Sequence, residues 1–511
     1  MSSTQTSTKR IAINSIVLYI RMIVVMLIAL YTSRVVLKAL GVDDYGLYNV
    51  VGGVVSLFAF LRTSMEQATQ RFLNFEMGKG DGNLNNVFCV SLTIHILIAL
   101  VCLILTETVG LWFLNTYINI PLDREMAANV VYQCVILSLC TTIITVPYSA
   151  SVISHEQMTF YAIVNIADAV LKLGIAIVAL NSGTDTDRLI LYGVLMMLVS
   201  VLNILMYYVF CRMRYRETQF HFLFDKALFR QVFGFTSWTI VGQAATLGTN
   251  QGNNILLNMF HSVTANAAMG VGNQVGSAIL SLSGNFQTAF NPQMTKSYAA
   301  KDYSYLRFLL VAVSKLSFVL MLVVSLPIIF NIDIVLDTWL DVVPLGAGAF
   351  GILWIVQAII NSLSTPLYFC INASGNIKRT QLTSSCVYLS DLIVLFALFK
   401  VGLPPITAMW VKVSVVMVVL FVRLYFASKC VPGLSFRVYI KEVILPLALT
   451  VVLCVAFSVA AMSIAETSTK KWVATFTIII ISLLTTFFVA LHKEEREILT
   501  KTVKNILHKN S

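Results

Sequence analysis

Charged side chains stand inside stretches of this chain that are otherwise apolar, and their chemistry needs a physical explanation. Asp168 and Lys172 are four residues apart, so on a helix they share one face and can neutralise each other. Arg21 has no opposite charge within its own apolar stretch. A charge in such a stretch usually faces a water-filled cavity or a partner. An ion pair and a coupling site both stay open for Asp168 and Lys172, whereas ligand binding is favoured for Arg21.

Three more ionisable residues, Lys315, Asp391 and Lys412, lie within apolar stretches further along the chain. A lysine in this position can extend its ammonium group toward the membrane surface or pair with a group elsewhere. Both interpretations stay open for Lys315 and Lys412. Together with Asp391 they complete the set of buried charges that predicts a polar site within an apolar protein.

Amide and hydroxyl side chains form two stripes at helical spacing. The first stripe contains Gln243, Thr246, Asn250 and Asn254, and the second contains Asn273, Ser277, Ser281, Asn285 and Thr288. One interpretation is hydrogen bonding between helices, helped by nearby glycines such as Gly242 and Gly270 that allow close approach. The other is the wet wall of a central cavity suited to sugar hydroxyls. The sequence leaves both open.

The elements that carry these residues are predicted by composition. Of the 511 residues 58% are hydrophobic and only 12% are charged, and the mean hydropathy is +0.83. A chain of this kind has too little polar surface to cover a soluble globule, so the lipid bilayer must be its main solvent. Apolar runs of about twenty residues recur, which is the length an α-helix needs to cross a membrane. We therefore expect an all-α polytopic membrane protein.

Apolar runs bounded by charge, Gly, Pro or Asn predict about 14 transmembrane helices. They lie near residues 11–33, 45–61, 87–108, 127–148, 158–180, 189–210, 231–254, 263–290, 306–330, 346–368, 381–400, 406–426, 441–463 and 472–491. An even number places both termini on one side. The connections on the side of the termini hold most of the Lys and Arg residues, so both termini are predicted to be cytoplasmic.

The longest interior connection, residues 211–230, divides the predicted helices into groups. It separates an N-terminal six-helix lobe, 1–210, from a C-terminal six-helix lobe, 231–426, and residues 427–511 hold an extra helix pair and a cytoplasmic tail. A weak repeat lays Asn74–Asp81 on Thr295–Asp302, each after the second span of its lobe. The repeat predicts two pseudo-symmetric lobes around a central cavity at the membrane midplane.

Other classes of function find little support in the residues. The net charge of +11 is spread over short loops and forms no basic face with interleaved aromatics, so we expect no nucleic-acid partner. The nine cysteines include no CxxC motif or His ligand spacing, and no metal or other cofactor is predicted. Ser/His/Asp and Cys/His arrangements lack a scaffold to hold them. An enzyme is not expected, and there are no catalytic candidates.

Several segments carry a family likeness. Leu37–Val50, with Asp44 and Gly46, is similar to the first-loop signature of bacterial polysaccharide flippases of the Wzx type, and the segments 250–258, 265–268 and 285–298 resemble spans 7 and 8 of that family. The likeness covers most of the first twelve spans. It places the chain in the superfamily that also holds the multidrug and toxin extruders and the lipid II flippase.

This resemblance implies a function. The chain would move an undecaprenyl-diphosphate-linked oligosaccharide across the bacterial inner membrane by alternating access, for export of surface polysaccharide or the O-antigen of lipopolysaccharide. Polysaccharide polymerase and assembly proteins would be further partners. Arg21 best matches the cations that the family places near the diphosphate, and a guanidinium can hold two phosphate oxygens. Asp168 and Asp391 are the candidates for ion coupling.

The remaining cations and amides complete the predicted site. Candidate substrate-binding residues besides Arg21 are Arg62, Lys172, Lys315, Lys412, Gln243, Asn250, Asn254, Asn273 and Asn285. Arg62, at the end of the second span, could meet the headgroup first or simply be a solvated basic end. Two other functions stay open: an ion-coupled drug or metabolite antiporter of the same fold, and a non-transporting scaffold of a polysaccharide assembly complex.

Overall fold

The computed structural model describes residues 2–490 except 57–58, 80–82, 118–119, 184–186, 222–224, 262, 341–342 and 464–467. All described secondary-structure elements are helices. The chain divides into two compact units, here called the N-terminal unit, Arg10–Ile240, and the C-terminal unit, Val241–Ser511 together with Met1–Lys9. The boundary falls inside the long helix α8 (Lys226–Phe260). The tail predicted after residue 490 lies outside the described residues.

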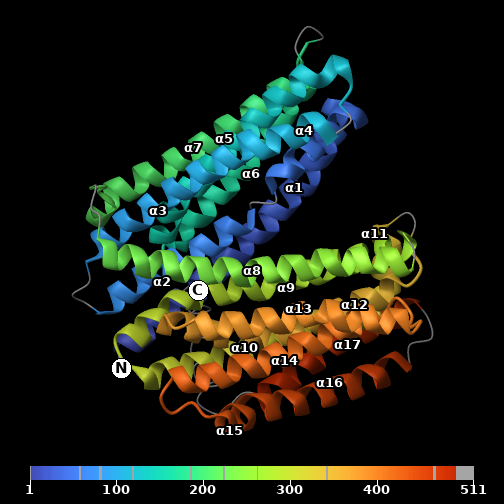
Figure 1. Cartoon of the computed structure of the whole chain (residues 1–511). Helices are drawn as coiled ribbons and strands as arrows, with labels where there is room; N and C mark the ends of the chain where they lie inside the picture. The colour runs from blue at the N-terminus through green and yellow to red at the C-terminus, as the bar shows by residue number, and fades with distance from the viewer. Residues whose placement is uncertain are drawn as a thin grey trace, which may run out of the picture. The chain divides into compact units, whose positions relative to one another are not determined.

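The helices follow the apolar runs (Figure 1). The first unit contains α1 (Ser2–Ser56), α2 (Ala59–Lys79), α3 (Leu84–Leu105), α4 (Leu111–Tyr117), α5 (Glu125–Ser154), α6 (Met158–Asn181) and α7 (Arg188–Arg214). The second contains α9 (Val263–Ala299), α10 (Tyr303–Phe330), α11 (Ile332–Trp339), α12 (Ala347–Ser374), α13 (Lys378–Lys400), α14 (Thr407–Cys430), α15 (Phe436–Tyr439), α16 (Leu445–Ser463) and α17 (Ser468–Thr485). The all-helical polytopic architecture is confirmed.

Ten of the described helices are long and apolar enough to cross a membrane. The other four predicted spans fall in helices that are more polar or shorter: the end of α1 with α2, then α8, α9 and α17. Helices α8 and α9 carry the two predicted polar stripes, which lowers their hydropathy. The prediction of about fourteen spans therefore depends on these four helices crossing as well.

The second predicted span, 45–61, is placed differently by the structure. Residues 45–56 continue α1 beyond a kink at Gly41, whose φ of 77° is in the left-handed region that glycine adopts without strain. Helix α2 then extends to Lys79. The hydropathy scan ended early because α2 carries Arg62, Glu66 and Arg71. Arg62 and Glu66 interact within the helix, one turn apart, and a hydropathy scan does not count such a pairing.

Helix α5 lies at the centre of the N-terminal unit, where it contacts α2, α3, α6 and α7. Its residues Val131, Tyr132 and Ile136 are fully buried in the core of this unit. The Tyr132 hydroxyl donates to the carbonyl of Thr106, 2.7 Å away. That carbonyl lies in a π-helical turn, residues 106–110, where the regular bonding pattern is interrupted. Burial and this hydrogen bond together fix α5 against α3.

Helix α12 has the corresponding central position in the C-terminal unit and contacts α9, α10 and α14. Glycines on α9 allow the close packing. A Cβ at Gly276 would lie 2.7 Å from the Cβ of Trp354, and one at Gly272 would lie 2.9 Å from the carbonyl carbon of Phe350. Neither position can take a larger residue without moving the helices apart. Small residues thus set the α9–α12 distance, as in other membrane helix pairs.

The connection that follows α7 is bound to the N-terminal unit by named contacts. The Asn85 amide donates to the carbonyls of Glu217 and Gln219 at 2.8 and 2.7 Å. His155 stacks on Tyr215 with ring centroids 3.9 Å apart, and its Nε2 lies 2.9 Å from Oε1 of Glu217. Residues 215–219 are therefore part of this unit.

The other end of the N-terminal unit is held by Arg124, just before α5. Its guanidinium forms ion pairs with Asp44 and with Asp187, the latter at 2.8 Å. Burial opposes the charge of Arg124, but the hydrogen bonds and charges of both carboxylates outweigh it, so its pKa is raised. Asp44 belongs to the segment Leu37–Val50, and Tyr48 of that segment packs edge-on against Tyr192. The segment Leu37–Val50, which resembles the Wzx flippases, therefore has a structural role in this unit.

Candidate functional site

The Asp168–Lys172 pair is the centre of a polar site in the N-terminal unit. The Lys172 ammonium lies 2.7 Å from Oδ2 of Asp168 on the same face of α6, as their spacing allows. The Asn203 amide on α7 donates to Oδ1 of Asp168 at 2.6 Å. The side chains are 40% and 25% exposed for Lys172 and Asp168. Because both remain accessible, the pair can exchange its partners for an ion or a ligand.

A cavity of about 150 Å³ adjoins this pair. It lies among α2, α5, α6 and α7 and is lined mainly by polar side chains: Arg62, Thr142, Thr145, Tyr161, Asn165, Asp168, Lys172, Ser200, Asn203 and Tyr207. The volume is large enough for a few water molecules. A polar cavity at membrane depth can keep charged groups hydrated, which lowers the cost of holding them there.

Two arginines adjoin the same site from different helices. Nη1 of Arg21 on α1 lies 3.3 Å from Oδ1 of Asn165, and its guanidinium is 5.2 Å from the Tyr161 ring centroid. Arg62 lines the cavity and interacts electrostatically with Glu66, one turn further along α2. With Lys172, the structure thus brings three predicted cations around one cavity. They outnumber the carboxylates Asp168 and Glu66.

The second site belongs to the C-terminal unit and contains Asp391 and Lys412. Asp391 on α13 is fully buried, and the Asn253 amide of α8 donates to its Oδ2 at 2.7 Å. The Lys412 ammonium on α14 donates to Oδ1 of Asn250 at 2.6 Å and lies 4.0 Å from the Trp354 ring centroid. Lys412 is 6% exposed. Each charge is bound to an amide of α8, so α8, α13 and α14 are joined by one polar network.

Lys315 is fully buried in α10 and therefore does not reach the surface by snorkelling. It lies among the buried residues of α10 in the C-terminal unit. Pairing inside the unit is the interpretation that remains for it.

The first three residues of the polar stripe on α9 are exposed, Asn285 and Thr288 are half-buried, and the opposite face of this helix is buried. Asn273, Ser277 and Ser281 are exposed, and Gly276 and Gln287 face α12, where the Gln287 amide donates to the carbonyl of Ser362 at 2.8 Å. An amide that faces hydrocarbon without a partner costs roughly 2–7 kcal/mol. The exposed face of α9 is therefore suited to water or polar groups rather than to lipid.

The polar residues of the stripe on α8 form bonds both to another helix and within α8 itself. Asn250 turns toward Lys412, while Asn254 donates to Oε1 of Gln251 at 3.4 Å on the same helix. Gln243 is half-buried near the start of the stripe. Bonding between helices thus accounts for Asn250. The exposed face of α9 instead fits the wet-wall interpretation.

Several residues at these sites were not identified from the sequence. Asn165 and Asn203 bind Arg21 and Asp168, and Asn253 binds Asp391. Arg423 on α14 donates to the Ser364 hydroxyl at 3.0 Å and lies 4.9 Å from the Tyr368 ring centroid. The only sequence signals were the helical spacings of Asn165, three residues before Asp168, and of Asn253, three residues after Asn250. No predicted site residue lies on the helix of Asn203. Which helix supplies a partner is decided by packing.

In the described part of the chain, no group of three or more His, Cys, Asp or Glu side chains could hold a metal ion. The sites described above instead combine single carboxylates with lysine, arginine and amide groups. Such a set can bind an anion through its cations, or a proton or monovalent cation through its carboxylates. Neither use requires a cofactor.

No protein-family model matches the chain, and no curated protein matches it. Solved structures do. A multidrug resistance MATE family transporter of the MOP superfamily, in its outward-facing conformation, is 13% identical with a TM-score of 0.71, over 84% of this chain and 97% of that one.

Two further solved structures are similar. A MOP superfamily transporter from Pyrococcus furiosus Vc1 (DSM3638) is 13% identical with a TM-score of 0.69, over 84% of this chain and 96% of that one. The MATE transporter ClbM in complex with Rb⁺ is 13% identical with a TM-score of 0.63, over the same shares. At this identity the likeness concerns the fold. The chain is thus a multi-pass α-helical membrane protein with the fold of MATE transporters of the MOP superfamily.

Proposed function

We propose that this protein is a transporter that moves an anionic lipid-linked oligosaccharide, with an undecaprenyl diphosphate carrier, across the bacterial inner membrane by alternating access. Both termini would be cytoplasmic, in keeping with the basic connections on their side of the membrane. The transported oligosaccharide would serve the export of surface polysaccharide or O-antigen. The MATE-like fold supports a membrane transporter, and the resemblance of Leu37–Val50 to the Wzx flippases supports this cargo.

The observation that carries the proposal is the excess of cations around the cavity of the N-terminal unit. Arg21, Arg62 and Lys172 supply planar or flexible donors that match phosphate oxygens. Arg21 is bound to the neutral Asn165 and Lys172 to the accessible Asp168, and a diphosphate can displace both contacts, whereas Arg62 interacts with Glu66.

The fold alone does not set the charge of the cargo. The Pyrococcus furiosus structure is described as having a binding pocket of reverse polarity that suggests a different function. Site residues must therefore support the choice of substrate, and here they favour an anion. Polysaccharide polymerase and assembly proteins are proposed partners because a flipped oligosaccharide must next be polymerised or exported.

The test is transport by purified protein in liposomes. The substrate is undecaprenyl diphosphate with a fluorescent N-acetylhexosamine, and a membrane-impermeant quencher reports the fraction moved to the outer leaflet. We expect Arg21→Ala to slow transport roughly 10- to 100-fold, because a hydrogen-bonded charge contributes about 1.5–3 kcal/mol. Arg34→Ala, on the same helix and exposed, is the matched control. Wild-type rates in Arg21→Ala would remove Arg21 from the mechanism.

A second candidate is an ion-coupled drug or metabolite antiporter. It is favoured by Asp168 and Asp391, each of which accepts an amide hydrogen bond near a lysine, an arrangement that can exchange a proton. Resistance to cationic compounds on overexpression, with normal surface polysaccharide after gene deletion, would favour this candidate. The third candidate, a scaffold that does not transport, predicts that charge-neutralising substitutions at Arg21 and Asp168 have no effect in cells.

A further inference from the structure

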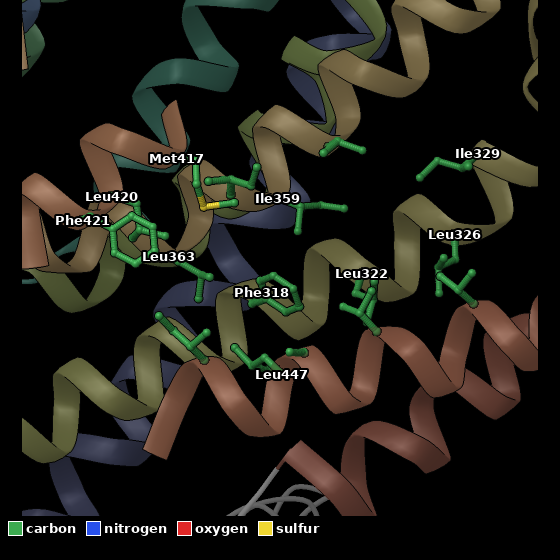
Figure 2. A pocket seen from close by; sticks show the side chains of 16 residues that line it. Phe318, Leu322, Leu326, Ile329, Ile359, Leu363, Met417, Leu420, Phe421 and Leu447 are labelled. Atoms are coloured by element: carbon green, nitrogen blue, oxygen red, sulfur yellow. The ribbon is translucent and has the colours of Figure 1, made fainter. Parts of the chain in front are cut away.

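The C-terminal unit contains an apolar groove of about 400 Å³ between α10, α12, α14 and α16 (Figure 2). All sixteen lining residues are hydrophobic. In Figure 2 Phe318, Leu322 and Leu326 follow one another along α10, and Phe318 lies beside Leu447 of α16. Helix α16 belongs to the pair predicted to lie outside the two six-helix lobes. The groove is thus formed where this added helix meets the unit.

The groove has a buried floor and an exposed rim. Leu322, Leu326 and Leu447 are each no more than 3% exposed. Met417 of α14 and Val455 of α16 are 39% and 38% exposed. The opening therefore lies between α14 and α16 and faces the surroundings of a membrane helix. Water does not fill an apolar space stably, and an empty one loses packing contacts.

The groove has the length of one leaflet. Its lining runs from Phe318 to Ile329 on α10 and from Ile444, directly before α16, to Val455 on α16. At a rise of 1.5 Å per residue each run is about 16 Å long. Half of a hydrocarbon core about 30 Å thick has nearly the same length. An acyl chain fits this length, whereas a long polyprenyl chain would extend beyond the groove.

Cations lie at one end of the groove. Arg437 and Lys441 are exposed on the segment that leads into α16, shortly before Ile444. The Tyr439 hydroxyl, between them, donates to Ser314 of α10 at 3.1 Å, and Ser314 is one turn before Phe318. This bond places the cationic segment at the Phe318 end. Glu442 is the carboxylate of the same segment, so the two cations leave a net positive charge.

We propose that the groove binds one acyl chain of an anionic phospholipid, whose headgroup contacts Arg437 and Lys441. The apolar floor supplies the affinity for the chain, and the two cations supply the preference for a negative headgroup. Basic residues beside transmembrane helices attract anionic lipids by about 1 kcal/mol each. The bound lipid would fill the space between α16 and the rest of the unit and hold this helix in place.

Native mass spectrometry of the delipidated full chain tests the proposal, with dioleoylphosphatidylglycerol and dioleoylphosphatidylcholine as probes. We expect phosphatidylglycerol to bind the wild-type protein more tightly, by roughly fivefold to thirtyfold. The double variant Arg437→Gln/Lys441→Gln should bind both lipids about equally. Arg379→Gln, an exposed cation at the start of α13, is the charge control and should keep the preference.

Filling the groove provides the second arm. Ala448→Phe places a ring in the groove and should weaken binding of both lipids roughly tenfold, because the acyl chain loses its apolar site. Ala460→Phe, at an exposed position of the same helix outside the groove, should bind as the wild type does. Val451→Phe is a second groove variant in case Ala448→Phe does not give a monodisperse peak in size-exclusion chromatography.

Two results would overturn the proposal. One is equal lipid binding by Ala448→Phe, Val451→Phe and Ala460→Phe, which would place the bound lipid elsewhere. The other is displacement of bound phosphatidylglycerol by undecaprenyl phosphate at a lower concentration than phosphatidylglycerol itself needs for binding, with this displacement lost in Ala448→Phe. That result would make the carrier chain the occupant. Thermal unfolding gives an independent readout: phosphatidylglycerol should raise the midpoint of the wild type but not of Ala448→Phe.

Discussion

Each unit holds an aspartate within a long apolar helix, but the surroundings of the two aspartates differ. Asp168 on α6 is a quarter exposed, pairs with a lysine of its own helix and borders a polar cavity. Asp391 on α13 is fully buried, and the nearby Lys412 comes from another helix and binds Asn250. A pair beside water can open at little cost, whereas a buried one cannot. We therefore expect Asp168 to exchange partners during transport and Asp391 to stabilise the C-terminal unit.

The largest expected effect comes from Lys412→Ala. It leaves Asp391 buried without its nearby cation, which should lower the free energy of unfolding by roughly 3 kcal/mol. Thermal unfolding of purified protein, followed by size-exclusion chromatography, measures the change. Lys400→Ala, at an exposed position, is the control. If Lys412→Ala unfolds at the wild-type temperature, the polar network of Asp391 and Lys412 does not stabilise the C-terminal unit.

Asp168→Asn should affect transport more than stability. The change removes a charge from a half-exposed pair, so the free energy of unfolding should change by less than about 1 kcal/mol. Transport in the liposome assay should fall roughly tenfold, and its dependence on pH should flatten, if Asp168 carries the coupling ion. A variant with the wild-type pH profile would exclude this role. The same measurements on Asp391→Asn compare the two aspartates directly: this change should affect stability more than the pH dependence of transport.

The smallest expected effect concerns the connection after α7. The hydrogen bond from His155 holds the pKa of Glu217 below its usual value of 4.5, although partial burial opposes this. The stabilisation is therefore present at neutral pH and is lost as the pH falls through the lowered pKa, below 4.5. In the wild type, acid should lower the free energy of unfolding of the N-terminal unit by less than about 1 kcal/mol through this contact. Glu217→Gln should abolish that part of the loss.

Cleavage within the connection by an acid protease, followed from pH 5 down to pH 3, measures that effect. The wild-type connection should become easier to cleave as the pH falls, and Glu217→Gln should be cleaved at a rate that changes less. Glu76→Gln, whose ion pair with Lys79 is on α2, serves as the control. Equal acid sensitivity of all three proteins would show that the His155–Glu217 contact does not hold the connection.

The sequence predicted the fold better than the partners of the charges. Apolar runs are local properties, so the helices could be found from them, apart from α2, where Glu66 and its neighbours masked the pattern. The Asp168–Lys172 pair was also predictable because its members are one helical turn apart. Asn203 and Asn253 could not be assigned as partners, since they lie on other helices than the aspartates they bind.

What the sequence by itself determined is an all-helical membrane protein with a small set of charges at membrane depth. Hydropathy decides this because lipid accepts only segments that satisfy their own backbone hydrogen bonds. The tertiary structure decided which charges share a cavity, which one is buried with an amide, and where α16 leaves an apolar groove. These features depend on residues far apart in the chain, whose proximity follows from how the helices pack.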